Sequence, residues 1–307
     1  MKEIKTVSII GLGALGVLFG HHLSKRMPKG NLRIIADKER IDRYRSEHVY
    51  CNEERCDFQY VTPEEQADPA DLLIFAVKND GLTDAIQACK NHVGEHTIIL
   101  SALNGITSEA IIGDTYGMEK VLYCVAQGMD AVKAGNRLTY DHMGMFCFGE
   151  RDPDEELTEK IKAVAEFFDK KEVPYQIIPE MFKHLWSKFM LNVGVNQTVA
   201  VYGSNYGEIQ RPGQARETMI AAMREVMVLS EKEGIHLTEE DIEYWLDVLS
   251  KLSPEGKPSM AQDLEAKRFS EVELFSGTVL ALGRNHGILT PVNEKLYNRI
   301  KAIESEY

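Results

Sequence analysis

Three polar side chains recur at every fourth residue in an otherwise apolar stretch of the chain. Lys188, Asn192 and Asn196 stand at i, i+4 and i+8 among Trp, Phe, Met, Leu and Val. On a helix this spacing places them in one slanted row. Polar groups in apolar surroundings need partners, so we expect the row either to bond a neighbouring helix or to line a substrate site. A lysine there, protonated at neutral pH, could act as a general acid.

A glycine-rich segment near the start of the chain is the second chemical signal. It follows a predicted strand, opens a predicted helix, and consists of Gly11, Leu12, Gly13, Ala14, Leu15 and Gly16. In such a segment the first glycine makes the tight turn, the second lets the backbone approach a pyrophosphate, and the third allows close helix packing. The helix N-terminus attracts the anion. The segment predicts a dinucleotide-binding loop, and a simple strand-to-helix turn is the alternative.

Asp37 ends the second predicted strand, 21 residues after Gly16. A carboxylate at this position can accept hydrogen bonds from an adenosine ribose, which favours NAD over NADP. Lys38 and Arg40 follow closely, and either could instead meet a 2′-phosphate. Asp37 could also simply cap the next helix. The choice of cofactor therefore stays open at this point.

Two further polar residues stand at the carboxyl ends of predicted strands. Lys78 closes the third strand, and Asn104 follows the fourth. Ligands of open α/β sheets bind at this edge, so both side chains are placed to touch a cofactor or a substrate. Asn104-Gly105 is also a common turn pair, so a purely structural role is an equal alternative.

Ser259, with Gln262 three residues later, forms a capping-box pattern. We expect a long helix from Ser259 towards residue 287. A hydroxyl at a helix N-terminus can also hold a carboxylate. Glu271 falls on the same expected helix, where a lone glutamate is usually a solvated surface charge.

The elements that must position these residues follow from the hydrophobic pattern. Short apolar runs alternate with amphipathic stretches in the first half, which is typical of a parallel sheet with crossover helices. The runs are apolar on both faces, as expected of strands covered by helices on either side. Strands are predicted at residues 6–10, 32–36, 71–77, 97–102, 121–125, 145–149 and 174–178, and helices at 17–25 and 155–170.

The pattern becomes helical from Glu180 onward, and no further strand is predicted there. Thr290 followed by Pro291 marks a helix start, with Thr as the N-cap and Pro as the first helical residue. We therefore expect a Rossmann-type, doubly wound α/β domain with a mainly parallel sheet over residues 1–179, and an all-helical domain over residues 180–307.

Composition excludes several classes of function. The 307 residues suffice for two domains, and the 44% hydrophobic and 27% charged shares are ordinary for a globular protein. A formal charge of -13 without a basic run disfavours binding to nucleic acid or to an anionic membrane. No apolar stretch reaches the roughly 20 residues of a membrane helix, and we expect no leader. The five cysteines form no CxxC pair, so we expect no metal site and a reducing, cytoplasmic location.

Taken in order, these motifs resemble the ketopantoate reductase (2-dehydropantoate 2-reductase) family over nearly the whole chain. The family pattern has a glycine-rich start, a Lys after the third main strand, an Asn-Gly after the fourth, a helix reading K-x-x-x-N-x-x-x-N, and an S-M-x-Q-D segment leading to a Glu. The matching elements here are residues 11–16, Lys78, Asn104-Gly105, the Lys188 row, residues 259–263 and Glu271.

The resemblance implies an oxidoreductase that passes a hydride from NADPH to ketopantoate, a small keto acid, for pantothenate and coenzyme A synthesis. Lys188 would donate the proton to the 2-keto oxygen. Residues 11–16 and Lys78 would bind the cofactor. Asn104 and Glu271 would contact cofactor and substrate. The substrate's carboxylate and hydroxyl would be bound by Asn192, Asn196 and Ser259.

Two residues depart from the family pattern. Asp37 stands near the end of the second strand, where many members carry an Arg that holds the 2′-phosphate, so NADH is an alternative to NADPH. Leu103 stands before Asn104, where the family often has Gln, so we expect a different pocket edge.

Two other functions compete with ketopantoate reduction. One is reduction of another 2-keto or 3-keto acid on the same architecture. The other is a non-catalytic dinucleotide sensor, which would need only the first domain's motifs, so the Lys188 row and Glu271 weigh against it. A homodimer through the apolar helices of the second domain is as compatible with the sequence as a monomer.

Overall fold

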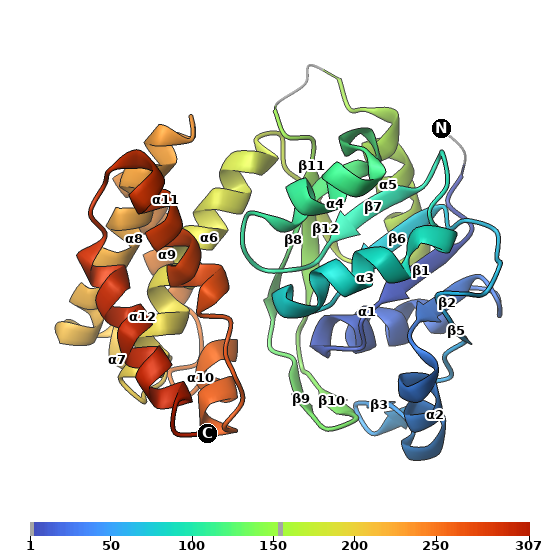
Figure 1. The fold of residues 1–307 in the computed structure, drawn as a ribbon, viewed down its shortest axis with the longest axis horizontal. Helices are drawn as coiled ribbons and strands as arrows, with labels where there is room; N and C mark the ends of the chain where they lie inside the picture. Colours follow the sequence, from blue (N-terminus) through green and yellow to red (C-terminus); the bar gives the residue numbers. More distant parts are fainter. Residues whose placement is uncertain (1–2, 153–155) are drawn as a thin grey trace. The chain divides into compact units, whose positions relative to one another are not determined.

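The computed structural model describes residues 3–152 and 156–307 (Figure 1). The chain divides into two compact units, Met1–Phe182 and Lys183–Tyr307. Among the helices of the described ranges, none combines the length and hydrophobicity of a membrane-spanning helix. Nor do those ranges bring three or more His, Cys, Asp or Glu side chains together as metal ligands.

The first unit is built around a mainly parallel sheet. Within the described residues this sheet has eight strands in the order β12-β11-β8-β7-β6-β1-β2-β5. All neighbouring pairs are parallel except β8 and β11. The strands are β1 Val7–Ile10, β2 Leu32–Ile35, β5 Tyr60–Val61, β6 Leu72–Phe75, β7 Ile98–Ser101, β8 Val121–Met129, β11 Met143–Gly149 and β12 Tyr175–Ile177. Strands extend from β1 in both directions, which confirms the doubly wound α/β class.

Helices cover both faces of this sheet, which explains why its strands are apolar throughout. Side chains alternate along a strand. In β6, Leu72 and Ile74 therefore pack in one cluster, while Leu73 and Phe75 pack in another. The first cluster includes side chains of α1 and α5, and the second those of α3 and α4, which lie in front of the sheet in Figure 1. The helices are α1 Ala14–Ser24, α3 Leu82–Ala88, α4 Ser108–Tyr116 and α5 Glu159–Lys171. The expected first residue of α5, Glu155, lies outside the described residues.

A second, small sheet with the order β4-β3-β10-β9 was not expected. Its strands are only two or three residues long and carry exposed side chains, so they show no hydrophobic period. They are β3 Tyr50–Cys51, β4 Glu54–Arg55, β9 Val132–Ala134 and β10 Arg137–Thr139. The remaining elements of the first unit are the helix α2 Lys38–Glu47 and the short helices η1 Asn79–Gly81, η2 Lys90–His92 and η3 Met118–Lys120.

The second unit is helical throughout its described residues, as predicted. The helix α12 begins with Pro291 after Thr290 as the N-cap, which confirms that start signal. The helices are α6 Met181–Val201, which begins in the first unit, α7 Tyr206–Gln210, α8 Gln214–Lys232, α9 Glu239–Ser250, α10 Ser259–Glu265, the π-helix η4 Glu273–Gly277, α11 Thr278–His286 and α12 Pro291–Glu304.

The long helix predicted for residues 259–287 is wrong, because the segment forms α10 and then η4 with α11. The chain leaves the helical path after α10, and Lys267 takes a left-handed φ of 51°. The Arg268 guanidinium donates a hydrogen bond to the Asp263 carboxylate at 2.9 Å across this break. The interruption therefore has its own bonded structure.

Candidate functional site

The glycine-rich loop between β1 and α1 is shaped by close backbone contacts. Gly11 has a φ of 97°, and a Cβ there would lie 2.6 Å from the Ala76 carbonyl oxygen. A Cβ on Gly16 would lie 1.9 Å from the Gly11 carbonyl oxygen. Both positions therefore require glycine. Leu12 is buried, whereas Gly13 is exposed, so the backbone of the loop is accessible at Gly13.

The start of α1 offers backbone N–H groups to an anion. Gly13 is the N-cap and has no side chain to accept hydrogen bonds from the helix, and the first turn contains no acidic residue. Ala14 and Leu15, the first helical residues, are half-buried. The N-terminus of a helix attracts negative charge and presents unpaired donors. The residues present therefore fit a pyrophosphate group.

Asp37 follows β2 and is the N-cap of α2. Its Oδ1 accepts a hydrogen bond from the Arg40 backbone N–H at 2.7 Å, which confirms the capping interpretation. Its Oδ2 also lies 3.5 Å from the Arg40 guanidinium, and the two side chains are 53% and 62% exposed. A carboxylate has further lone pairs, so capping leaves Asp37 able to accept a ribose hydroxyl.

The residues that follow β6 and β7 differ in how exposed they are. Lys78 is exposed and precedes the short helix η1 as its N-cap. Asn104 is half-buried, and Gly105 follows it with a φ of 93°. Leu103 is 5% exposed and packs in the same apolar cluster as Phe75. The side chain of Leu103 is thus part of the core, and its effect on the pocket edge stays a prediction.

Four of the predicted cofactor positions share one edge of the sheet. The strands β2, β1, β6 and β7 are adjacent and parallel. Gly11, Asp37, Lys78 and Asn104 each follow the carboxyl end of one of them. This edge is where open α/β sheets bind their ligands.

The predicted polar row lies on α6. Lys188 is half-buried, whereas Asn192 and Asn196 are 9% and 6% exposed. The Asn196 amide donates a hydrogen bond to Asn192 Oδ1 at 3.2 Å. The other amide atom, Asn196 Oδ1, is buried and has no hydrogen-bond partner within the described chain. Buried polar atoms are normally paired, so Asn196 Oδ1 is an acceptor that remains available to a donor from outside the described chain.

His184 extends this row by one turn and is not among the site residues predicted from the sequence. Burial and, as a smaller cause, the nearby Lys188 ammonium group together lower its pKa to about 4. The imidazole is therefore neutral at physiological pH. Its ring lies 6.4 Å from the ring of Trp245, whose indole N–H donates to Ser187 Oγ at 2.8 Å. The signal that could have identified His184 is the same spacing of four residues.

Gln197, next to Asn196, belongs to a different and well-bonded network. Its amide donates to Asn293 Oδ1 at 3.3 Å, and Ser276 Oγ donates to Gln197 Oε1. Asn293 Nδ2 donates in turn to Glu225 Oε2 at 2.7 Å. These bonds join α6 to η4, α12 and α8. Helix-to-helix bonding is thus carried by Gln197, while Asn196 keeps an unpaired oxygen.

Ser259 and Glu271 do not share a helix. Ser259 is exposed as the first residue of α10, and Pro258 is the N-cap, in an extended conformation with ψ of 163°. The capping box is therefore wrong, and the Gln262 amide instead donates to the Lys257 carbonyl at 2.9 Å. Glu271 is half-buried and lies just before the π-helix η4. Such π-helical turns are frequent at functional sites.

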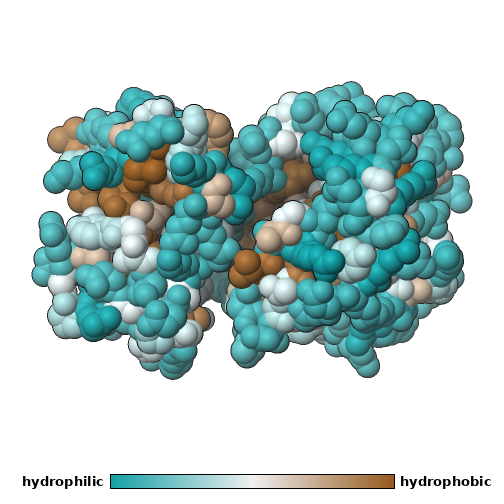
Figure 2. All heavy atoms as spheres, turned by 90° about the horizontal axis from the view of Figure 1, so that it is seen from below, coloured by the Kyte–Doolittle hydropathy of each residue, from teal (hydrophilic) through white to brown (hydrophobic). Residues whose placement is uncertain are grey.

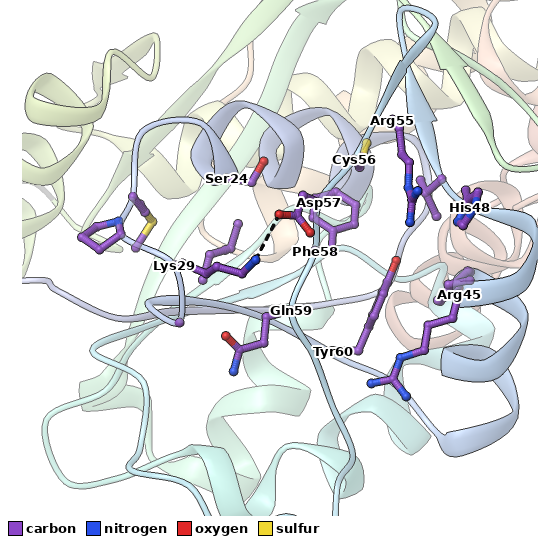
Figure 3. A pocket seen from close by; sticks show the side chains of 16 residues that line it. Ser24, Lys29, Arg45, His48, Arg55, Cys56, Asp57, Phe58, Gln59 and Tyr60 are labelled. Atoms are coloured by element: carbon purple, nitrogen blue, oxygen red, sulfur yellow. Dashed lines mark hydrogen bonds and ion pairs between the residues drawn. The ribbon is translucent and has the colours of Figure 1, made fainter.

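A pocket of about 500 Å³ lies at the opposite end of β2 from Asp37 (Figure 3). Its lining includes Leu32, where β2 begins, and Ser24, where α1 ends. Arg45, Arg55 and Tyr60 also line it, as Figure 3 shows. An 11-residue helix such as α1 is roughly 16 Å long, so this pocket is separate from the glycine-rich loop.

Comparison with known proteins supports one family. A 2-dehydropantoate 2-reductase of Aquifex aeolicus (strain VF5) is 26% identical over 304 residues, which cover 96% of each chain. One of Streptococcus pyogenes serotype M6 is 25% identical over 305 residues, covering 97% of this chain and 98% of the relative. The fold is also that of D-mandelate dehydrogenase in its complex with NADH, with a TM-score of 0.85, 21% identity, and coverage of 98% of this chain and 99% of that chain.

Family models match both units of the chain. Residues 7–152 match the model described as Ketopantoate reductase PanE/ApbA, and residues 180–304 match the model of its C-terminal part. Together the two matches span most of the sequence. The chain therefore belongs to the ketopantoate reductase family, a family of oxidoreductases.

Proposed function

We propose that this protein is an NADPH-dependent 2-dehydropantoate 2-reductase, which reduces ketopantoate to pantoate for pantothenate and coenzyme A synthesis. The observation that carries the proposal is the row of Lys188, Asn192 and Asn196 on α6, with the buried, unpaired Asn196 Oδ1. This row occurs in a chain that aligns with 2-dehydropantoate 2-reductases over nearly its full length.

The residues of the second unit would bind and protonate the substrate. The Lys188 ammonium group donates its proton to the 2-keto oxygen as negative charge develops there. His184 is neutral, because its pKa is lowered to about 4, so it adds no second positive charge beside Lys188. Asn196 Oδ1 accepts a hydrogen bond from the substrate hydroxyl, and Asn192 and Ser259 bind its carboxylate.

The first unit would hold the cofactor, so residues 1–179 form the dinucleotide-binding domain and residues 180–307 the substrate domain. When bound, NADPH supplies the hydride. The glycine-rich loop binds its pyrophosphate, Lys78 and Asn104 bind at the neighbouring strand ends, and Glu271 contacts cofactor or substrate. Arg40, beside the Asp37 carboxylate, offers a guanidinium to the 2′-phosphate.

Reduction of a different 2-keto acid is the second candidate. The likeness of the fold to D-mandelate dehydrogenase favours it, because mandelate is a 2-hydroxy acid with a bulkier side chain. The two candidates share the chemistry at Lys188 and differ in what surrounds the rest of the substrate.

A panel of keto acids tests the proposal. Oxidation of NADPH and NADH is followed with ketopantoate, phenylglyoxylate and 3-methyl-2-oxobutanoate, which lacks the hydroxyl of ketopantoate. We expect the highest kcat/KM for ketopantoate. A hundredfold preference for another acid would instead establish the second candidate.

The variant Asn196→Ala tests the proposed hydrogen bond between Asn196 and the substrate hydroxyl. Loss of one buried hydrogen bond should raise KM for ketopantoate about tenfold. The KM for 3-methyl-2-oxobutanoate should change little. Asn298→Ala, an exposed asparagine on α12, is the matched control. Equal effects of Asn196→Ala on both acids would contradict the assigned contact.

A homodimer that forms through the helices of the second unit stays a prediction. Figure 2 shows a mostly hydrophilic surface with limited hydrophobic areas. In the second unit Leu289 is 90% exposed and Val228 is 48% exposed. Light scattering on the purified protein gives the mass directly. A cytoplasmic location is likewise a prediction.

A further inference from the structure

The pocket of Figure 3 lies at the opposite end of β2 from Asp37 and has no role in the proposed reaction. Its volume of about 500 Å³ falls within the roughly 300 to 1,000 Å³ of small-molecule sites. We call it the β2-start pocket, because Leu32, the first residue of β2, lines it. Its lining combines aromatic rings with positively charged side chains, so it suits an organic anion.

Positive charge dominates the lining of the β2-start pocket, although the whole chain has a formal charge of -13. The Asp, Glu, Lys and Arg residues that line it are Lys29, Arg45, Arg55 and Asp57. Asp57 Oδ2 lies 3.5 Å from Lys29 Nζ, so these two charges compensate each other. The charges of the two arginines are therefore not balanced by any other lining residue.

The neighbours of the two arginines in the chain do not neutralise them either. Within the part of the chain that the structure describes, neither guanidinium group forms an ion pair or a hydrogen bond. Glu54, which precedes Arg55, pairs with Lys25 instead, and Glu47 accepts a hydrogen bond from the Asn136 amide at 2.7 Å. Arg45 and Arg55 are both exposed, so a ligand can reach them. Guanidinium groups of this kind are good partners for phosphate.

Both arginines lie near one aromatic hydroxyl group. Burial raises the pKa of Tyr60 to about 12, against the opposing effect of the Arg45 and Arg55 charges. Such effects act over short distances, so the two guanidinium groups, which come from α2 and β4, both lie near the Tyr60 hydroxyl. Figure 3 shows Arg45, Arg55 and His48 on the same side of the pocket as Tyr60, away from the Lys29–Asp57 pair. An anion bound beside this hydroxyl would lie near both arginines.

Aromatic rings supply the apolar part of the lining. Tyr60 stacks on Tyr44 with ring centroids 5.7 Å apart, and Phe58 meets Tyr60 edge-on at 6.3 Å. Tyr44 and Tyr60 are half-buried, so part of each ring stays accessible. Aromatic side chains pack well against a flat ring of a ligand.

His48 lines the pocket in a strained backbone conformation. Its φ is 58° and its ψ is 156°, a region that residues other than glycine rarely adopt. Its ring meets that of Tyr50 edge-on at 6.5 Å, which holds the side chain at the end of α2. Strain of this kind clusters at ligand sites, where it places a side chain for binding. An imidazole N–H there would donate a hydrogen bond to an anion.

We propose that the β2-start pocket is a second ligand site, which binds a phosphate monoester that carries an aromatic group. The two uncompensated arginines match the charge of such a phosphate, which approaches -2 at neutral pH. Tyr44 and Tyr60 contact the ring, and His48 donates to the phosphate. The site lies apart from the glycine-rich loop, so it does not depend on the proposed reaction.

Phenyl phosphate is the probe that tests this site. Its binding is measured at pH 8 by saturation-transfer NMR of its ring protons, first alone and then with NADPH in excess. We expect saturable binding that NADPH leaves unchanged, with a Kd about tenfold lower than those of methyl phosphate and benzyl alcohol, which each lack one half of the probe. Equal binding of either fragment overturns the assigned ligand class. Loss of binding in excess NADPH would show that the probe occupies the cofactor site, and it overturns the proposal.

Substitutions locate the probe in the pocket. Arg45→Ala and Arg55→Ala should each raise the Kd of phenyl phosphate about tenfold. Arg43→Ala, which removes an exposed arginine of α2 that does not line the pocket, is the matched control and should change the Kd little. Circular dichroism reports folding, and each single arginine variant tests the site separately. Wild-type affinity in a folded arginine variant overturns the assigned site.

His48→Gly separates strain from binding. Glycine adopts this backbone conformation without a Cβ penalty, so the variant should keep the Tm of the wild type. The Kd of phenyl phosphate should rise several-fold, because the imidazole donor is lost. Wild-type affinity in this variant overturns the place of His48 in the site.

Discussion

Replacing Glu109 by glutamine should stabilise the first unit at alkaline pH and leave it nearly unchanged at acid pH. Burial raises the pKa of Glu109 from 4.5 to about 7. The folded unit thus binds this proton more tightly than the unfolded chain does. The stability linked to it is fully present below about pH 4.5 and is lost as the pH rises to about 7. This loss is about 3 kcal/mol, since a tenfold change in proton affinity is worth about 1.4 kcal/mol.

Urea unfolding at pH 5 and pH 9 measures this difference in the free energy of unfolding. Circular dichroism follows both units, whereas fluorescence follows only the second unit, which contains both tryptophans, Trp186 and Trp245. Glu109→Gln should exceed the wild type by less than about 1 kcal/mol at pH 5 and by up to about 3 kcal/mol at pH 9. The fluorescence transition should be the same in both proteins. A stability difference that is equal at the two pH values would refute the reasoning.

Three further outcomes are expected. Lys188→Ala should lower kcat by about two to four orders of magnitude while cofactor binding persists, and more than half of the wild-type kcat would exclude the acid role. Gly16→Ala should abolish cofactor binding, measured as the enhancement of NADPH fluorescence, because the alanine Cβ would lie 1.9 Å from the Gly11 carbonyl oxygen. Normal binding would refute the assignment of this loop to the cofactor. Arg40→Ala should lower kcat/KM for NADPH about tenfold and spare NADH. An NADH preference that Asp37→Ala relaxes would instead show that the carboxylate binds the ribose.

The strands of the main sheet were predictable because burial on both faces leaves a strong sequence signal. The predicted residues 71–77 and 97–102 enclose β6 and β7 with only short overhangs. The small sheet left no such signal, because strands of two or three partly exposed residues have no hydrophobic period. Its pairing of Tyr50 with Arg137 joins segments that are far apart in the sequence.

Residue spacing also gave wrong or incomplete predictions where two neighbouring residues could each have played the same structural role. The Ser259 pattern fits a capping box, but Pro258 sets the helix start and leaves Ser259 inside α10. Similarly, Asn196 and Gln197 are adjacent amides in the same apolar helix. Only the tertiary structure distinguishes Gln197, which bonds Asn293, from Asn196, whose Oδ1 is unpaired.

Asp37 caps α2 and also lies where a cofactor ribose or its 2′-phosphate would bind, so both roles affect any attempt to engineer cofactor choice. Replacing Asp37 by alanine removes its charge and also the acceptor for the Arg40 backbone N–H at the start of α2. Loss of an N-cap typically costs about 1 kcal/mol. A library that admits only serine, threonine or asparagine at this position would remove the charge while keeping a capping oxygen, and so would separate selection for cofactor from selection for folding.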